Sequence, residues 1–593
     1  MVQFQQVSIG NFHSRVVLIG DVPLGGSNPV RIQSMTSTNT MDTKATVDQS
    51  IRMIDAGCEF VRITAPGIKE AEHLAVIKIE LKKRGYNTPL IADIHFNPKA
   101  AEVAAGIVEK IRINPGNYID RNRGKVDYSD AEYNEEIYKI RTRIKPLINI
   151  CKKCGTAMRI GSNHGSLSER ILCRYGDTPE GMAESALEFV RICEDFNYHS
   201  LVLSMKASNV KVMIQATRLL VHRMMEEGMN YPIHLGVTEA GDAEDGRIKS
   251  AAGIGPLLED GIGDTIRVSL TEDPEFEIPV AKIITGKFSQ RKDRRSLIKD
   301  QNHIAINPFS YTRRKTRKVH NIGGSQVPVV IISSGNPAED IHKFKGEIFP
   351  DFICNTKNSI VSDREQLSGE SEYPGNKIEF IYINPGSEIE KISESIKQNL
   401  SSVVVIESGY DEPVRQIREM IFNLIKNEIN NPVILKRKYA NISLEELQLT
   451  ASPDFSFLLV DGLLDGIWID AEGIDLEDIC QIAFGILQAT GSRISKTEYI
   501  ACPSCGRTLF NIQDTLQKIK AKTKHQKGLK IGVMGCIVNG PGEMADADYG
   551  YVGSVPGKIT LYKRNRIVKK NVNEKNAVDE LIIIIKADGN WID

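Results

Sequence analysis

Apolar runs alternate with helical patterns from residue 30 to about residue 270, and this rhythm is the strongest constraint on the fold. The stretches between the runs have helical spacing, as at 46–57, which ends in a glycine typical of a helix C-cap. Eight strands alternating with helices over roughly 250 residues predict a (β/α)8 TIM barrel. A doubly wound open sheet is the alternative, but no G-x-G-x-x-G motif follows the first strand. The predicted strands are 30–36, 60–64, 89–95, 110–114, 157–163, 200–206, 231–237 and 264–270.

Polar and charged residues recur at or just after the ends of these predicted strands. In a barrel of this kind, the carboxyl ends of the strands form the rim where active sites are built. Five of the rim residues are Arg or Lys, and such cations converging from different strands suit a ligand with two phosphate groups. The candidate site residues at the rim are Arg62, Asp93, His95, Arg112, Asn114, Arg159, Asn163, Ser204, Lys206, His234, Glu239, Arg267 and Ser269.

A second cluster of reactive residues lies near the end of the chain. Cys502 and Cys505 form a C-x-x-C pair, Cys536 follows after a helical and a strand-like stretch, and Glu543 lies in a Gly-Pro-Gly turn. Three thiolates and one carboxylate suit an iron–sulfur cluster better than zinc. A structural zinc site normally has four Cys or His ligands, and the only histidine nearby is His525. A zinc knuckle and ordinary buried cysteines are the alternatives.

Another C-x-x-C pair, Cys151 and Cys154, ends a helical pattern just before the fifth predicted strand. This position is on the barrel face opposite the rim, so we interpret the pair as two helix-terminal thiols. A zinc site joining it to Cys502 and Cys505 would require two remote segments to meet.

Four regions follow from these patterns. Residues 1–285 form the substrate-binding barrel, and 286–326 form a linker with basic runs at 287–297 and 312–318. Residues 327–490 form an inserted α/β (TIM-like) domain with a structural role, since its strand ends carry Ser, Gly, Asn and Asp rather than Arg and Lys. Residues 491–593 form a small α/β domain that carries the cysteines. The predicted strands of the inserted domain are 327–335, 377–384, 402–409, 431–435, 455–461 and 466–470.

Composition excludes several functional classes. A net charge of −1 argues against a general role at nucleic acids or membrane surfaces, and no apolar run reaches the roughly 18 residues of a membrane span. The first ten residues lack the apolar core of a signal peptide. Ten cysteines without regular spacing do not form a secreted disulfide framework. We therefore expect a cytoplasmic, bacterial protein.

With these residues in view, the chain resembles the 4-hydroxy-3-methylbut-2-enyl diphosphate synthases of the non-mevalonate isoprenoid pathway. The central block departs from the two-domain form of that family but is similar to its long, three-domain form. The motifs that carry the resemblance are AlaAspIleHisPhe (92–96), ArgIleAsnProGlyAsn (112–117), ArgIleGlySerAsnHisGlySerLeu (159–167), GlyValThrGluAlaGly (236–241), IleArgValSerLeu (266–270), AlaCysProSerCysGlyArg (501–507) and GlyCysIleValAsnGlyProGlyGlu (535–543).

The resemblance implies an oxidoreductase. It opens 2-C-methyl-D-erythritol 2,4-cyclodiphosphate by a two-electron reduction, giving 4-hydroxy-3-methylbut-2-enyl diphosphate and water. By resemblance, Cys502, Cys505 and Cys536 hold one [4Fe–4S] cluster per chain, and Glu543 caps its fourth iron. The cationic rim would grip the diphosphate, and Glu239 is a candidate proton donor.

The resemblance also implies reduced ferredoxin or flavodoxin as electron donor, and leaves open which of them serves and whether the chain forms a homodimer. In the two-domain form the barrel and cluster domain pair across a dimer, and we expect the inserted block to let one chain cover its own barrel. The residues alone leave two other functions open. One is a phosphate-binding barrel enzyme, similar to pterin synthases, with a structural zinc. The other is a non-catalytic scaffold.

Overall fold

The computed structural model describes residues 12–94, 96–119, 127–289, 306–336, 340, 344, 348–355, 360–363, 378–538 and 540–592. These residues form two compact units. The first unit contains the described parts of 8–250, 260–299 and 496–593, and the second contains those of 251–259 and 300–495. His95 and residues 290–305 of the predicted basic linker lie outside the described residues.

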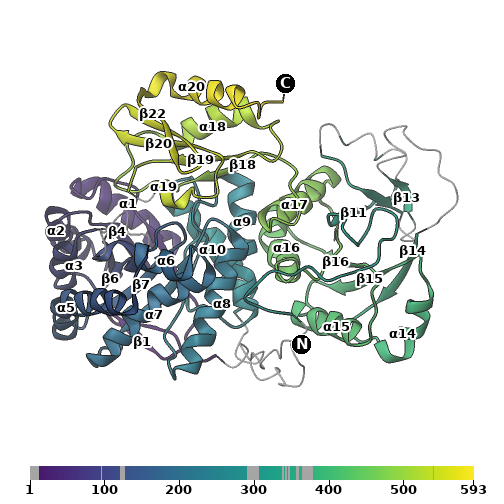
Figure 1. Cartoon of the computed structure of the whole chain (residues 1–593), viewed down its shortest axis with the longest axis horizontal. Coiled ribbons are helices and arrows are strands. Elements are labelled where there is room, and N and C mark those ends of the chain that lie inside the picture. Colours follow the sequence, from purple (N-terminus) through teal and green to yellow (C-terminus); the bar gives the residue numbers. More distant parts are fainter. Residues whose placement is uncertain are drawn as a thin grey trace. The chain divides into compact units, whose positions relative to one another are not determined.

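Within the described part of the first unit, eight parallel strands form a barrel (Figure 1). Their order is β8-β7-β6-β5-β4-β3-β10-β9, and a parallel bridge between Leu203 and Ile233 joins the two ends of the sheet. All eight runs predicted as barrel strands contain one of them, so the predicted TIM barrel is confirmed. The strands are β3 (Arg31–Met35), β4 (Phe60–Thr64), β5 (Leu90–Asp93), β6 (Lys110–Ile113), β7 (Ala157–Asn163), β8 (Leu201–Lys206), β9 (His234–Leu235) and β10 (Thr265–Ile266).

Helices connect the barrel strands, and their ends follow from local sequence. Helix α1 begins after Asp42, whose side chain accepts a hydrogen bond from the Ala45 amide, and it ends at Gly57, whose φ is 108°. The described helices are α1 (Thr43–Ala56), α2 (Ile68–Lys83), α3 (Pro98–Ala105), α4 (Pro115–Tyr118), α5 (Asp130–Cys154), α6 (Glu169–Tyr175), α7 (Pro179–Asp195), α8 (Val210–Glu226), α9 (Ala243–Glu259), the 3-10 turn η1 (Pro274–Phe276) and α10 (Glu277–Gly286). Cys151 and Cys154 therefore close α5, as predicted.

A short hairpin, β1 (Val17–Ile19) and β2 (Val22–Leu24), packs against the barrel strands at their amino-terminal ends. Its side chains Val17, Ile19 and Leu24 form one buried cluster with residues that begin several strands, among them Phe60 and Ala157. The hairpin thus seals one end of the barrel with apolar surface, which leaves the opposite end for polar chemistry.

The second unit contains a seven-stranded sheet in the order β13-β12-β11-β17-β16-β15-β14, in which every described strand except β13 runs parallel to its neighbours. The predicted inserted α/β fold is confirmed. Arg313 and Thr316, from the second basic run, both bind Asp465 in this unit. The elements are β11 (Val329–Ser333), β12 (Phe352–Cys354), β13 (Ile360–Asp363), β14 (Glu379–Ile383), α14 (Ile389–Gln398), β15 (Ser402–Gly409), α15 (Val414–Lys426), β16 (Val433–Tyr439), α16 (Leu444–Leu459), β17 (Gly466–Ala471) and α17 (Leu476–Ala489).

Two predictions for this unit are wrong. Residues 455–459 belong to helix α16 rather than to a strand. The helix starts at a capping box made by Ser443 and Glu446, and all of its residues from Leu447 onward are buried, so its apolar run lacks the amphipathic spacing that marks surface helices. Strand β16 also continues beyond residue 435 to Tyr439, and near its end it carries the buried cations Lys436 and Arg437, the second of which pairs with Asp454 at 3.1 Å. The strand ends of this unit therefore do include Lys and Arg.

The C-terminal domain is a five-stranded mixed sheet with the helices α18 and α20 on one face and the short α19 on the other (Figure 1). Its core joins the sheet to α18 and α20 through residues such as Leu516, Ile531 and Leu581. The α/β fold predicted for the C-terminal region is confirmed. The elements are β18 (Glu498–Ala501), α18 (Ile512–Thr523), β19 (Lys530–Met534), α19 (Gly540–Glu543), β20 (Tyr549–Val555), β21 (Lys558–Lys563), β22 (Arg566–Asn573) and α20 (Glu574–Ala587).

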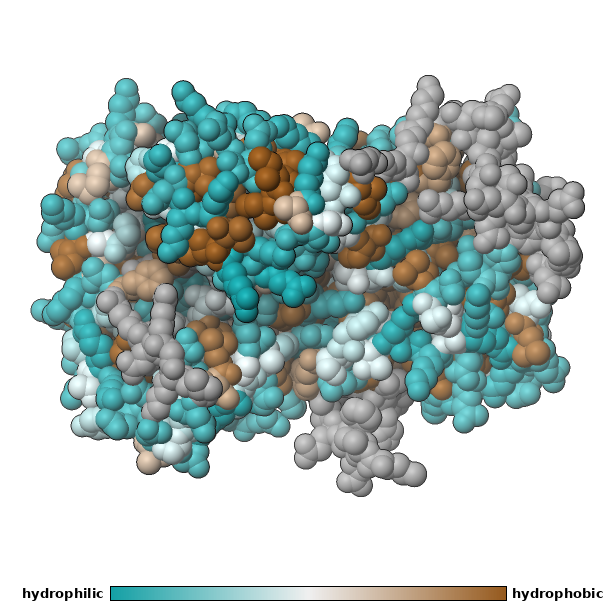
Figure 2. Space-filling view, turned by 45° about the horizontal axis from the view of Figure 1, so that its top comes forward, coloured by the Kyte–Doolittle hydropathy of each residue, from teal (hydrophilic) through white to brown (hydrophobic). Residues whose placement is uncertain are grey.

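Apolar side chains appear among hydrophilic ones on the face shown in Figure 2. On the C-terminal domain the exposed apolar residues include Ile567 and Val568 of the edge strand β22 and Ile583 of α20. In the part of the chain that the structure describes, no helix combines the length and apolar character needed to cross a bilayer.

Candidate active site

The C-terminal domain is anchored to the barrel of its own chain by charged contacts. Asp242, just before α9, pairs with Lys520 of α18 and accepts a hydrogen bond of 2.7 Å from Gln517. Lys249 of α9 pairs with Glu498 of β18 at 2.9 Å. These contacts hold β18 and α18 beside the rim of the barrel, so that the loops following β18 and β19 face the carboxyl ends of the barrel strands.

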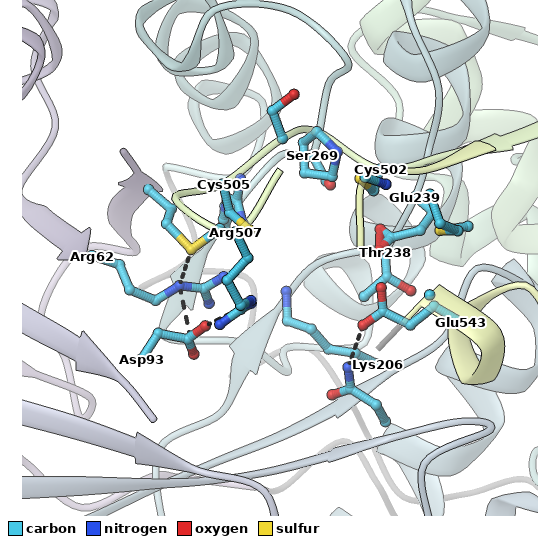
Figure 3. Close-up of a pocket in the computed structure, with 18 of the residues that line it drawn as sticks. Arg62, Asp93, Lys206, Thr238, Glu239, Ser269, Cys502, Cys505, Arg507 and Glu543 are labelled. Carbon is cyan, nitrogen blue, oxygen red and sulfur yellow. Dashed lines mark hydrogen bonds and ion pairs between the residues drawn. The ribbon is translucent and has the colours of Figure 1, made fainter. Parts of the chain in front are cut away.

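A cavity lies between these loops and the barrel rim (Figure 3). It encloses about 720 Å³ of empty space, including its opening to solvent. The barrel contributes Met35, Arg62, Asp93, Arg112, Arg159, Asn163, Lys206, Val237, Thr238, Glu239, Arg267 and Ser269, and the C-terminal domain contributes Cys502, Pro503, Ser504, Cys505, Arg507, Met534, Gly535, Cys536, Gly540 and Glu543.

Strand register explains why the barrel cations converge. Arg112 of β6 lies opposite Asp93 of β5 and Arg159 of β7 in the parallel ladders. Side chains that share a register position lie on the same face of the sheet, which here is the interior of the barrel. Arg62, Lys206 and Arg267 reach the same interior from β4, β8 and the end of β10, and all five cations are buried. Neighbouring strands thus deliver a ring of positive charge to one cavity.

Few carboxylates balance this charge. Asp93 lies 4.0 Å from Arg62 Nε and 3.6 Å from Arg112 Nη1, while Arg267 has its own partner in Glu277 at 3.1 Å. Burial lowers the pKa of Arg62 to about 10. Burial, with the neighbouring cations, also holds the pKa of Lys206 well below its ordinary value. The cavity is therefore a cationic site in which ionised groups are destabilised until an anion enters.

Two guanidinium groups have donors that nothing in the described part of the chain accepts. The Nε and Nη1 atoms of Arg159 are buried without a hydrogen-bond acceptor, and so are the same two atoms of Arg507. A buried donor without an acceptor costs about 1–3 kcal/mol, and more when it is charged. Such donors are expected where a bound anion supplies the missing acceptors.

The three cysteines line the cavity from two loops. Cys502 and Cys505 follow β18, and Cys536 follows β19. The Gly535 amide donates to Cys502 Sγ at 3.3 Å, and burial raises the pKa of the Cys502 thiol to about 12. Among the described residues, no three His, Cys, Asp or Glu side chains converge on a point that a single metal ion could occupy. The three thiols nevertheless line one cavity, and thiolates are the usual ligands of iron–sulfur clusters.

Glu543 enters the cavity from the short turn α19. Its Oε1 accepts a hydrogen bond of 2.9 Å from Asn163 Nδ2, and its carbonyl oxygen accepts one of 3.3 Å from Ser208. Burial raises the pKa of the Glu543 carboxyl to about 7. Glu543 is thus held by two barrel residues, one at its carboxylate and one at its backbone carbonyl, on the side of the cavity opposite Arg507 (Figure 3).

Glu239 is the one non-glycine cavity residue of the barrel that the structure places at positive φ, with a value of 51°. It is buried, and it follows Gly236, where β9 has already ended. Residues other than glycine adopt this conformation at a cost, and such strain is concentrated at functional sites. The chain therefore leaves the barrel ladder early and turns Glu239 into the cavity.

Four predicted site residues are not among the lining residues that the structure describes. Asn114 caps the short helix α4 and contacts Ser166, and Ser204 lies on the interior of β8 beside Gly161. His234 is fully buried in β9, and burial holds its pKa well below its ordinary value. The fourth, His95, lies outside the described residues.

The cavity also contains residues that sequence reasoning did not single out, chiefly Arg507, Thr238 and Met35. Arg507 contacts Asp93 through Nη2 at 3.8 Å, and Met35 Sδ accepts a 3.0 Å contact from Arg62 Nε. The signal for Arg507 was its place two residues after Cys505, since a neighbouring cation stabilises the thiolate form of cysteine.

Comparison with known proteins agrees with this geometry. Residues 14–282 match the family description "GcpE TIM-barrel domain", and residues 498–587 match "GcpE protein C-terminal domain". The 4-hydroxy-3-methylbut-2-en-1-yl diphosphate synthase (flavodoxin) of Bacteroides fragilis is 49% identical over 601 residues, covering 97% of this chain and 95% of the relative. The chain belongs to this synthase family. The predicted family, and with it an oxidoreductase of isoprenoid precursor biosynthesis, is confirmed.

Other synthases of the same name are similar along the whole chain. The Porphyromonas gingivalis protein is 47% identical over 582 residues, covering 97% of each chain. The Leptospira interrogans protein is 42% identical over 650 residues, covering 98% of this chain and 97% of its own. Because these matches span the inserted unit, the three-domain form is common to them. The synthase family is one of iron–sulfur enzymes, and the three cysteines are present here as free thiols.

Solved structures add little. Dihydropteroate synthase of Burkholderia cenocepacia is 14% identical, with a TM-score of 0.33, and covers 48% of this chain and 100% of its own. N-acetylneuraminic acid synthetase of Leptospira borgpetersenii is 13% identical, with a TM-score of 0.32, and covers 50% of this chain and 95% of its own. Likeness at this level carries no argument about the function of this chain.

Proposed function

We propose that this chain converts 2-C-methyl-D-erythritol 2,4-cyclodiphosphate to 4-hydroxy-3-methylbut-2-enyl diphosphate inside this cavity. The reaction takes up two electrons and two protons and releases one water. One observation carries the proposal: a ring of buried, under-compensated cations faces three cysteines across a single cavity. The cations match a ligand with two phosphates, and the cysteines match a redox group that can deliver electrons.

The cysteines Cys502, Cys505 and Cys536 would hold one [4Fe–4S] cluster per chain. Their positions in two loops around one cavity, with a backbone amide that donates to Cys502 Sγ, support a cluster. Glu543, in the turn that follows Cys536, would be the ligand that substrate displaces. When bound, the cluster supplies electrons and an iron atom that can accept the departing oxygen.

The barrel residues would bind and orient the substrate. Arg62, Arg112, Arg159, Lys206 and Arg267 would hold the two phosphates, and Asn163, Ser269 and Asp93 would add or orient hydrogen bonds. Fixing both phosphates directs the carbon–oxygen bond toward the cysteines, so much of the catalysis would come from positioning. The shape of the rim would be set in part by three residues that lie outside the cavity, Asn114, Ser204 and His234.

Glu239 would donate the proton to the departing oxygen. Support comes from its strained backbone and from its place on the cavity wall, near Thr238 and on the same side as Cys502 (Figure 3). A carboxyl group held in a water-poor cavity is well suited to general acid chemistry.

The electron donor would be flavodoxin, because the similar synthases carry flavodoxin in their names, and ferredoxin is the alternative. One chain would complete its own site, because its C-terminal domain contacts its own barrel, and a homodimer would not be required for activity. The bacterial origin of the relatives supports a bacterial, cytoplasmic location.

An anaerobic assay tests the proposal. Cluster-reconstituted protein with dithionite-reduced viologen is expected to oxidise the viologen once the cyclic diphosphate is added. Glu543→Gln should lower the rate by about 100-fold or more, since even outer-shell partners of metal ligands are worth 10- to 100-fold. A colourless protein that binds zinc would favour the non-redox barrel enzyme, and a brown protein without turnover would reject this substrate.

The approach of the two domains provides a second test. A Cβ atom on Gly542 would collide with the carbonyl oxygen of Gly165, so these backbones can meet only if residue 542 lacks a side chain. Gly542→Ala is expected to lower kcat/KM by about 100-fold, because an ångström of misplacement has that effect. In Gly286→Ala, where an added Cβ meets nothing within 4 Å, activity should be unchanged. Equal activity of both variants would refute the need for this contact.

A further inference from the structure

Thr271 lies where two loops of the cavity wall meet, and it is only 2% exposed. Its backbone amide donates a 2.9 Å hydrogen bond to the Gly241 carbonyl, in the barrel loop that carries Glu239. Its hydroxyl lies 3.2 Å from the Ala501 carbonyl oxygen and 3.4 Å from that of Cys502, so these two oxygens share one donated proton. Thr271 therefore binds the loop of Glu239 through its backbone and the loop of Cys502 through its side chain.

A backbone bridge joins the same two loops. Ala240 and Ala501 form a parallel β-bridge, so the sheet of the C-terminal domain reaches onto the barrel at this point. Glu239 comes directly before one member of the bridge and Cys502 directly after the other, and both line the cavity on the same side (Figure 3). The bridge thus sets the spacing between the candidate proton donor and the first cysteine of the loop.

The loop of Glu239 needs outside support to keep its shape. Glu239 and Ala243 have φ of 51° and 47°, which residues other than glycine adopt at a cost, and Gly241 between them has φ of 100°. Strand β9 has already ended at Leu235. A strained backbone persists only where the surrounding structure over-determines it. Thr271 and the bridge provide such support from the side of the C-terminal domain.

The loop of Cys502 is also held from within its own domain. The Cys502 amide donates to the Val533 carbonyl at 3.2 Å, and the Gly535 amide donates to Cys502 Sγ at 3.3 Å. These bonds fix Cys502 relative to β19, but they do not fix it relative to the barrel. The hydroxyl of Thr271 is the contact that adds this second reference.

We propose that Thr271 is a positioning residue for the reaction. Its hydroxyl holds the cysteine loop in register with the loop of Glu239, so that the acid and the proposed cluster act on the same carbon–oxygen bond. Thr271 is not among the described lining residues of the cavity, so it acts through Glu239 and Cys502 rather than on the substrate. The inference rests on the proposed function, because it takes Glu239 as the acid and Cys502 as a cluster ligand.

The test compares Thr271→Val with Thr271→Ser in the cluster-loaded enzyme. Valine keeps the shape of threonine without its hydroxyl, whereas serine keeps the hydroxyl. Thr497→Val is the matched control. Thr497 is also 2% exposed, and its hydroxyl also donates to two backbone carbonyls, those of Thr523 and Gln526, but it does not line the cavity.

Three measurements are made on each variant. Steady-state kinetics give kcat and KM separately. Iron content and the visible spectrum check that the variant holds its cluster. Hydrogen exchange of residues 238–241 and 501–505 reports how firmly the two loops are held, independently of turnover.

Thr271→Val is expected to keep its iron and its KM, because the cations that bind the phosphates are untouched. Its kcat should fall about 10-fold, since an ångström of misplacement costs about 100-fold and the remaining contacts limit the shift. Hydrogen exchange of both segments should become faster. Thr271→Ser should recover most of kcat and of the protection, and Thr497→Val should match the wild-type enzyme in both.

Wild-type kcat and exchange in Thr271→Val would overturn the inference. An equal loss in Thr271→Ser or in Thr497→Val would also overturn it, because the effect would then come from packing or from general stability. If Thr271→Val does not fold, Thr271→Ala and Thr271→Ser carry the same comparison, because they too differ in the hydroxyl. A wild-type enzyme with a full cluster but no turnover would instead refute the proposed function, and the exchange measurements would still decide whether Thr271 holds the two loops together.

Discussion

Replacing Cys536 with serine is expected to abolish turnover. The thiolates of Cys502 and Cys505 come from one loop and that of Cys536 from another, so Cys536 is the ligand that ties the strand β19 to the proposed cluster. A serine hydroxyl is a far poorer ligand for iron than a thiolate. Cys536→Ser should lose iron, sulfide and visible absorbance after reconstitution, and viologen oxidation should fall to the background rate.

The second C-x-x-C pair provides the control. Cys154 is an exposed thiol at the end of α5, next to the glycine that caps the helix, and it does not line the cavity. Cys154→Ser should retain full iron content and full turnover. Loss of iron in Cys154→Ser, or an intact cluster in Cys536→Ser, would move the redox site away from the cavity described here.

The barrel could be predicted because its strands are bounded clearly in the sequence. Short β-branched runs, separated by helical stretches with glycine ends, leave few other solutions. The prediction was least accurate for the last two strands. Runs of seven residues were expected at 231–237 and 264–270, but β9 and β10 span two residues each. At Gly236 the chain leaves the barrel sheet and turns Glu239 into the cavity. The amino-acid composition of a run does not indicate where its strand pairing ends.

The wrong strand at 455–461 has a different cause. A helix buried on all sides loses its amphipathic period, so Phe455, Phe457 and Leu458 look like a strand running through a core. The information that decides the case lies about ten residues earlier, in the capping box of Ser443 and Glu446. Apolar content alone could not separate the two structures.

The candidate site was predictable where one strand end supplies each residue. Register places Arg112 and Arg159 opposite each other, and Arg62 points to the same barrel interior from two residues before the position opposite Asp93, because parallel strands in a barrel end at one rim. Arg507 could not be placed in this way. Its role depends on how the C-terminal domain meets the barrel, which is decided by side-chain contacts such as that between Lys520 and Asp242. Sequence patterns within either domain carry no record of such contacts.

Replacing Arg159 with methionine should have opposite effects on stability and on activity. The guanidinium is 2% exposed, its Nε and Nη1 atoms have no acceptor in the described part of the chain, and burial holds its pKa well below its ordinary value. Replacing such a buried charge with an apolar side chain should raise the stability of the ligand-free enzyme, by up to about 1–4 kcal/mol. The same change removes a phosphate contact worth about 2–5 kcal/mol, so kcat/KM should fall roughly 30- to 5,000-fold.

Arg218→Met is the matched control, because Arg218 is equally buried but pairs with Asp260 at 2.8 Å, away from the cavity. Removing Arg218 leaves a buried carboxylate uncompensated and should destabilise the protein by about 3–5 kcal/mol, while the folded fraction keeps its activity. Urea unfolding of the ligand-free proteins and steady-state kinetics measure the two effects. If Arg159→Met were destabilised like Arg218→Met, the guanidinium of Arg159 would already be satisfied within the protein, and the cavity would not be held ready for an anion. If it is stabilised and inactive, the unpaired charge of Arg159 exists for the substrate rather than for the fold.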